Sequence, residues 1–166
     1  MGFQVVLLLF LSLSLYSLLK LRYHRPVLKP LGWVWPPLRY FILALALGSI
    51  LAVAVAVFLR LRHQVTESIS IANVFLLGLV LGPILEESLF RGCLPPVLER
   101  SGGKLVAVVV TALLFALFHG PVNAVHWFWL TATGIAYGWI RIASESTSAS
   151  ALMHASYNLA LILISR

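Results

Sequence analysis

Apolar runs long enough to cross a lipid bilayer recur along this chain, separated by short polar breaks. A spanning helix needs about 20 predominantly apolar residues. The runs cover residues 3–19, 38–59, a third run that begins near residue 69, 104–119, 121–140 and 148–164. Charged residues make up only 10% of the sequence, against about a quarter of a soluble domain. The sequence therefore predicts an all-α fold, a polytopic membrane helix bundle with about six transmembrane helices.

The first apolar run lacks the basic start and small-residue cleavage site of a secretory signal, so we expect it to remain as a helix. Residues 1–68 are then two N-terminal transmembrane helices joined by a basic loop, and residues 69–166 form a four-helix core. A single cysteine, Cys93, excludes an internal disulfide and a paired-cysteine metal site. The net charge of +7 is explained by loop cations that orient a membrane protein, so no nucleic-acid partner is predicted.

The basic residues divide unequally between the two sides of a six-helix bundle. Nine fall on one side and three on the other, which favours the larger group in the cytoplasm and both termini outside. The larger group is Lys20, Arg22, Arg25, Lys29, Arg39, Arg91, Arg100, Lys104 and Arg141, and the smaller is Arg60, Arg62 and Arg166. We therefore expect a multi-pass protein of the cell (plasma) membrane.

Two adjacent carboxylates stand in one apolar region, in the stretch GPILEESLFRG at residues 82–92. An ionisable group at the centre of a spanning helix costs about 2.5 to 3.5 kcal/mol on insertion scales, so each carboxylate needs a partner. Glu87 and Arg91 are four residues apart with the glutamate first, the favourable order for an ion pair on one helix face. Glu86 points about 100° away around the helix, so its partner must come from elsewhere.

Two further pairs occur at the same spacing, Phe115 with His119 and His154 with Asn158. Residues four apart share one face of a helix. A lone histidine on an apolar helix is more often a packed core residue than a catalyst. Three such sets in one membrane protein are much harder to explain by packing alone.

The distances along the chain place the first two sets at one depth. A turn is expected at residues 101–103, and Glu86 and His119 lie sixteen residues before and after it. At 1.5 Å per residue, each side chain would lie about 24 Å from the turn on antiparallel neighbours. The prolines at residues 95–96 should bend the first of these helices. His154 lies nearer its own loop, so we expect the groups to meet in the cytoplasmic half of the membrane.

In this order on successive helices, the three sets resemble the signature motifs of the CAAX protease and bacteriocin-processing family, also called CPBP or Abi. Members of that family are intramembrane glutamic-type endopeptidases, and the resemblance covers about residues 71–164. It implies that residues 69–166 are a catalytic core acting on a peptide or a membrane-anchored protein, without a cofactor. The motifs read Glu86-Glu87-x-x-x-Arg91, Phe115-x-x-x-His119 and His154-x-x-x-Asn158.

Peptide hydrolysis gives each of these residue types a task, because it needs a base, a water ligand, oxyanion donors and an acid for the leaving amine. A carboxyl group in a low-dielectric site holds a proton more tightly, which suits Glu86 as base and then acid. His119 can bind the same water, and His154 and Asn158 can donate to the oxyanion. The resemblance implies the same roles, with Glu87, Arg91 and Phe115 in support. These supporting residues would hold the helix and fix where the catalytic carboxylate points.

A zinc site is an alternative use of the same side chains. Two histidines and one glutamate form a known catalytic zinc set, which Glu86, His119 and His154 could supply. The compact H-E-x-x-H helix is absent, and a zinc site leaves Asn158 without a role. The serines beside the motifs do not lie in a G-x-S-x-G turn, so a serine nucleophile is discounted.

Two functions from other classes also fit the pattern. A catalytically silent membrane scaffold or regulator could use the polar cluster to bind a partner helix or a peptide tail. A transporter with an intramembrane carboxylate is a third possibility. The endopeptidase is preferred because a scaffold has no evident need for a base, a water ligand and two oxyanion donors together. The sequence does not distinguish prenylated C-termini, bacteriocin leaders and membrane-anchored regulatory proteins as substrates.

Overall fold

The computed structural model describes residues 31–61, 74–121 and 123–164, with a few further positions between residues 6 and 29. Over these residues the secondary structure is entirely helical, which confirms the predicted class. The elements are α2 (Leu38–Leu61), η1 (Val74–Leu81), α4 (Gly82–Glu87), η2 (Ser88–Cys93), α5 (Pro95–Phe118), α6 (Ala124–Ser144) and α7 (Thr147–Ile164). Most of the predicted first span, the start of the third, and Arg22, Arg25, Arg62 and Arg166 lie outside the described residues.

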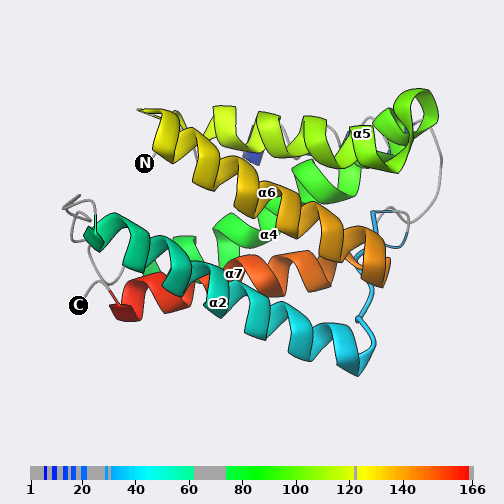
Figure 1. Cartoon of the computed structure of the whole chain (residues 1–166). Helices are drawn as coiled ribbons and strands as arrows, with labels where there is room; N and C mark the ends of the chain where they lie inside the picture. The colour runs from blue at the N-terminus through cyan, green and yellow to red at the C-terminus, as the bar shows by residue number, and fades with distance from the viewer. Residues whose placement is uncertain are drawn as a thin grey trace.

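The helices pack as two pairs with the η1-α4-η2 segment between them (Figure 1). Helix α2 runs alongside α7 in the same direction, and α5 runs antiparallel to α6. Both pairs depend on glycine. A methyl group on Gly48 would collide with the Met153 carbonyl of α7, and one on Gly134 would come within 3.0 Å of Cα of Ala112 on α5. Small residues at such crossings let membrane helices approach closely.

The segment from residue 74 to residue 93 is one irregular helix that carries both carboxylates. Its outer parts, η1 and η2, have wide π-helical turns, and the ordinary α-helical turn α4 lies between them. Leu94 keeps helical dihedral angles and donates its backbone N–H to the Leu89 carbonyl five residues earlier. Wide turns of this kind occur often at functional sites, because they re-aim the side chains that follow.

The expected interruptions after this segment are present. Pro95 begins α5, where the missing N–H of a proline costs no hydrogen bond. Eight residues later Gly103 has φ 77° and ψ 176°, and the helix breaks into two limbs. A positive φ is accessible to glycine at little cost. The predicted turn at residues 101–103 is confirmed, and an element boundary lies where the prolines predicted a bend.

The end of the first connection is fastened to the turn between α6 and α7. Thr147 donates its hydroxyl to the carbonyl of Leu31 at 2.5 Å, and Ser146 donates to that of Val34 at 2.5 Å. The indole N–H of Trp33 donates to Ser88 at 3.1 Å. Residues 31–34 are therefore anchored to the bundle beside the η1-α4-η2 segment.

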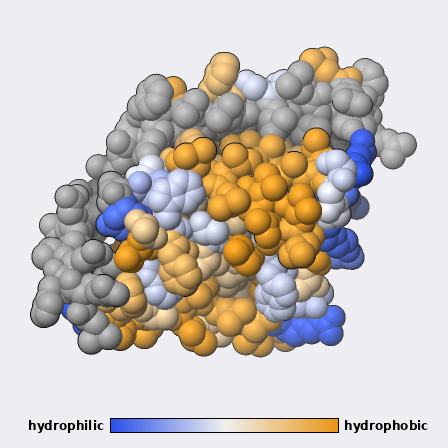
Figure 2. Space-filling view, turned by 45° about the horizontal axis from the view of Figure 1, so that its top comes forward, coloured by the Kyte–Doolittle hydropathy of each residue, from blue (hydrophilic) through white to orange (hydrophobic). Residues whose placement is uncertain are grey.

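Three helices among the described residues are long and apolar enough to cross a membrane: Leu38–Phe58, Pro95–Phe118 and Thr147–Ile164. Helix α6 coincides with the predicted fifth span but is not among them, so the predicted number of six is not confirmed. In Figure 2 a broad apolar surface is bordered by hydrophilic residues at its two sides. This distribution is typical of an integral membrane protein.

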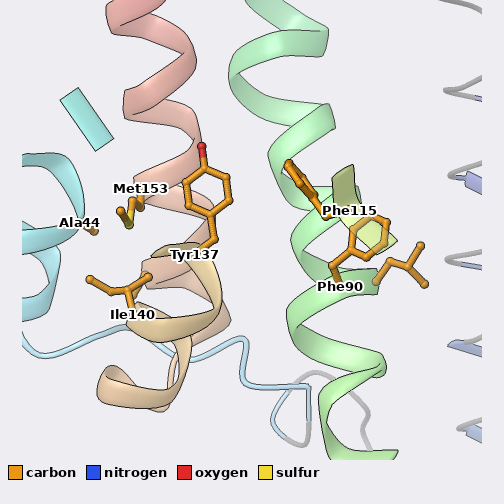
Figure 3. Packing of buried hydrophobic residues seen from close by; sticks show 8 residues of the cluster. Ala44, Phe90, Phe115, Tyr137, Ile140 and Met153 are labelled. Atoms are coloured by element: carbon orange, nitrogen blue, oxygen red, sulfur yellow. The ribbon is translucent and has the colours of Figure 1, made fainter. Parts of the chain in front are cut away.

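One buried apolar cluster joins the helices around the polar residues. It draws on α2, η2, α5, α6 and α7, and Figure 3 shows the ring of Tyr137 between Met153 and Phe115. Its members are Ala44, Leu89, Phe90, Phe115, Tyr137, Ile140, Ala149 and Met153. The cluster holds the elements that carry the candidate site in a fixed arrangement.

Candidate active site

The ion pair predicted from spacing is present at the centre of the bundle. Nη1 of Arg91 lies 3.1 Å from Oε1 of Glu87, and both side chains are fully buried. Nη2 of Arg91 donates to the Gly134 carbonyl on α6 at 2.9 Å. The guanidinium also lies over the ring of Phe115, 4.7 Å from its centroid. Arg91 therefore ties the η1-α4-η2 segment to α5 and α6.

Glu87 has two more partners, both on α7. Its Oε1 lies 2.9 Å from Nδ1 of His154, and its Oε2 accepts a hydrogen bond from Ser150 at 2.5 Å. A buried carboxylate with several donors is far better compensated than one with a single counter-ion. Sequence reasoning assigned Glu87 only to Arg91, and it missed Ser150, because no spacing rule connects positions on different helices.

Glu86 faces the two histidines. Its Oε2 lies 3.5 Å from Nε2 of His119 and 4.0 Å from Nε2 of His154. The same oxygen is buried and has no hydrogen-bond partner among the described residues. The structure thus brings together Glu86, His119 and His154, from three separate helices, around one carboxylate oxygen. The equal depth expected for Glu86 and His119 is confirmed.

The other nitrogen of each histidine fixes how the ring is held. Nδ1 of His119 lies 2.8 Å from the Phe115 carbonyl, and Nδ1 of His154 contacts the Glu87 carboxylate. A carbonyl and a carboxylate only accept hydrogen bonds, so each Nδ1 carries the proton. In a neutral ring the Nε2 facing Glu86 is then an acceptor. Holding one ring nitrogen to orient the other is common in enzyme sites.

Phe115 forms the apolar wall of the cluster. Its ring centroid lies 4.3 Å from that of His119 and 5.8 Å from that of His154, and the side chain is 2% exposed. One side chain thus contacts both histidines and the guanidinium of Arg91. The supporting role expected for Phe115 stays a prediction.

Tyr137 belongs to the same cluster and was not singled out by the sequence. It is 1% exposed, and its ring stacks on His154 with 4.8 Å between centroids and 19° between planes. Gly134 and Gly138 lie on either side of it, at the four-residue spacing of small residues that lets membrane helices pack closely. That packing brings the α6 backbone toward α5 and leaves the intervening tyrosine inside the bundle.

Asn158 is placed differently from the other candidates. Its Nδ2 donates to the carbonyl of Gly78 at 2.7 Å, and this hydrogen bond links α7 to η1. An amide nitrogen has two protons, and one remains for another acceptor. Asn158 shares a face of α7 with His154, as predicted from their spacing.

The two serines beside the motifs are engaged in helix hydrogen bonds. Ser88 donates to the Ile84 carbonyl at 2.6 Å, and Ser156 donates to that of Met153 at 2.9 Å. Neither is hydrogen-bonded to a histidine in the part of the chain that the structure describes. A serine nucleophile requires such a base.

No group of three or more His, Cys, Asp or Glu side chains that could hold a metal ion is found in residues 31–61, 74–121 and 123–164. The residues of the zinc alternative, Glu86, His119 and His154, are nonetheless the three that converge here. Their donor set of two imidazole nitrogens and one carboxylate oxygen is chemically suited to zinc. A chelator experiment distinguishes a metal site from a water site.

Comparison with known proteins identifies the family. The family model described as type II CAAX prenyl endopeptidase Rce1-like matches residues 67–160, which contain every candidate site residue. Neither a search of curated proteins nor a search of solved structures gives a significant match. The chain belongs to the Rce1-like family of type II CAAX prenyl endopeptidases.

Proposed function

We propose that this protein is an intramembrane endopeptidase that hydrolyses a peptide bond of a membrane-associated or prenylated protein with a water activated by Glu86. The observation that supports this best is the position of Oε2 of Glu86, 3.5 Å from Nε2 of His119 and 4.0 Å from Nε2 of His154. These separations are long for direct hydrogen bonds. They suit a bridging water held by carboxylate and imidazole.

In the proposed reaction Glu86 removes a proton from the water while His119 accepts the second hydrogen bond through Nε2. The hydroxide oxygen adds to the carbonyl carbon of the scissile bond, and a tetrahedral oxyanion forms. Glu86 then returns its proton to the leaving nitrogen as the C–N bond breaks, which releases an amine and a carboxylic acid. The carboxylate is regenerated, so the cycle balances without a cofactor.

The oxyanion is stabilised by α7. Asn158 donates through the amide proton that does not contact Gly78. Nε2 of His154 donates only from a ring protonated at both nitrogens, and in that state Glu87, 2.9 Å from Nδ1, is the counter-charge. Oxyanion donors of this kind are worth about 10² to 10³ in kcat each.

Membership of this family supports a membrane-anchored or prenylated substrate. Its members are described as prenyl endopeptidases, so we infer a substrate that the lipid bilayer presents, a peptide or protein with a membrane anchor. The excess of cations on one side of the bundle supports approach from the cytoplasmic half of a plasma membrane. Accessibility of the residues around Gly102 only from outside the cell would contradict this orientation.

The test is cleavage of prenylated and leader-type peptides by purified protein in nanodiscs. Cleavage should vanish with Glu86→Gln, fall by roughly 10² or more with Asn158→Ala, persist with the matched Glu99→Gln, and survive a chelator. Loss of activity with the chelator would favour the zinc alternative instead. Absence of cleavage by folded wild-type protein would favour the silent scaffold, whose partner binding should persist after Glu86→Gln.

A further inference from the structure

A second charged site lies at the end of the bundle where α5 begins and α6 ends, apart from the carboxylate-histidine cluster. It is a cavity of about 320 Å³ between both limbs of α5, the C-terminal part of α6 and Gly32 of the first connection. Glu86, His119 and His154 do not line it. Its charged lining consists of Lys29, Arg91, Glu99, Lys104, Arg141 and Glu145.

The charges of the lining do not cancel. Arg91 is already paired with Glu87 inside the bundle. The cations Lys29, Lys104 and Arg141 then face the two carboxylates Glu99 and Glu145, which leaves one positive charge in excess. A ligand with a single negative charge would neutralise this cavity.

Both guanidinium groups of the lining, those of Arg91 and Arg141, are held in place by other parts of the protein. Arg91 contacts Glu87 and the Gly134 carbonyl. Nε of Arg141 donates to the Arg91 carbonyl at 3.2 Å. The backbone of Gly32, with φ +78°, passes so close that a methyl group there would lie 2.7 Å from Cζ of Arg141. Nε of Arg91 is buried without a hydrogen-bond partner among the described residues. The cavity therefore has a preorganised cationic wall, whereas Lys29 and Lys104 are exposed at its rim.

The position of the cavity identifies the kind of anion that reaches it. It lies where α5 begins and α6 ends, and these two helix ends are at the same end of the bundle in Figure 1. Two residues that follow lining residues in the chain are apolar and exposed. Val97, next to Pro96, is 65% exposed, and Leu105, next to Lys104, is 76% exposed. A ligand here meets basic groups at its polar end and a lipid-facing surface along its length.

We propose that this cavity binds the phosphodiester headgroup of an anionic glycerophospholipid, with Lys29, Lys104 and Arg141 around the phosphate and the acyl chains along α5. Basic pockets between membrane helices bind anionic lipid headgroups in this manner. Lipid binding here does not require peptidase activity, although Arg91 borders both sites. Bound lipid would also bridge the first connection and α5, two parts of the chain that both line the cavity.

The experiment measures lipid binding to delipidated protein in detergent by native mass spectrometry. Phosphatidylglycerol is titrated against wild type and the double variant Lys29→Gln/Lys104→Gln, and phosphatidylcholine and inorganic phosphate are the comparison ligands. Each basic group near a lipid phosphate contributes roughly five-fold in affinity, so the double variant should bind phosphatidylglycerol about 25-fold more weakly. Glu99→Gln, which removes a negative charge from the lining, should strengthen binding.

The control variant Arg39→Gln/Arg100→Gln removes two cations from the same predicted side of the membrane without touching the cavity lining, and its affinity should stay within about two-fold of wild type. Equal losses in both double variants would mean general surface attraction and would overturn the proposal. So would equal affinity for phosphatidylcholine. Displacement of the lipid by millimolar inorganic phosphate would identify a free-anion site instead. All targeted lysines are exposed, and thermal unfolding verifies that each variant is folded.

Discussion

The carboxylate of Glu87 accepts a hydrogen bond from Nδ1 of His154 at 2.9 Å, across 67 positions of sequence and between two helices. The contact turns Nε2 of the histidine toward Glu86, 4.0 Å away. Glu87 therefore contacts both the guanidinium of Arg91 and the imidazole ring of His154, the ring that faces Glu86. The two adjacent carboxylates therefore have different environments: that of Glu87 is filled by hydrogen-bond donors, whereas Oε2 of Glu86 is buried without a hydrogen-bond partner among the described residues.

Glu87 and Arg91 should have a large interaction free energy in a double-mutant cycle, because they form a buried ion pair. Arg91→Met leaves Glu87 without its counter-ion and should lower the free energy of unfolding by about 3 to 5 kcal/mol. The double variant Glu87→Gln/Arg91→Met should be less destabilised than the sum of the two single variants by about 1 to 3 kcal/mol. Thermal or denaturant unfolding in detergent measures both quantities. Additive effects would contradict the direct interaction, and the exposed Arg39→Gln serves as the control.

Ser150→Ala should reduce turnover by about ten-fold or more with little change in KM, since it removes a hydrogen bond to the carboxylate that orients His154. The matched control is Ser156→Ala on the same helix, whose hydroxyl donates to the backbone carbonyls of Met153 and Ala44. Both variants should lose about 1 kcal/mol of stability. Only the first should lose kcat in the peptide cleavage assay, and equal kcat values would refute the positioning role.

Tyr137 should act through its ring, because the ring stacks on His154. Tyr137→Phe keeps that surface and should retain most activity, whereas Tyr137→Leu should lower kcat and stability together. An aromatic pair contributes about 0.5 to 1.5 kcal/mol beyond buried area. Tyr157→Leu removes a neighbouring aromatic that does not stack on the histidine, so a similar loss of kcat in both leucine variants would show a general packing effect.

Any side chain at Gly48 should destabilise the protein, because a methyl group there would collide with the Met153 carbonyl and the Ser156 hydroxyl of α7. Gly48→Ala should destabilise the protein by about 1 to 3 kcal/mol through overpacking, although alanine favours a helix by about 1 kcal/mol. The adjacent, half-buried Ser49, whose hydroxyl donates to the Leu45 carbonyl of its own helix, is the control, and Ser49→Ala should change stability by less than about 0.5 kcal/mol. A stabilised Gly48→Ala would show that α2 and α7 are further apart than described. Unfolding midpoints in detergent give the comparison.

Much of the fold and part of the site could be predicted from local rules. The apolar runs predict spanning helices, and the glycine pair at residues 102–103 predicts the break that Gly103 makes. The four-residue spacing of Glu87 and Arg91 predicts their ion pair, and equal distances from the turn place Glu86 beside His119. The boundary at residue 68, the number of spans and the orientation remain predictions, as do the catalytic roles of Glu86, His119, His154 and Asn158.

The sequence by itself determined that the chain is a membrane helix bundle with a polar cluster, because both conclusions rest on spacing along single helices. Only the tertiary structure decided that His154 and Ser150 contact Glu87, that Tyr137 stacks on His154, and that Asn158 contacts Gly78. The reason is physical. Lipid and protein core are both apolar, so hydrophobic periodicity does not distinguish the two faces of a spanning helix. The rotation and depth of each helix are set by close packing at glycines and by buried hydrogen bonds, which involve residues far apart in the chain.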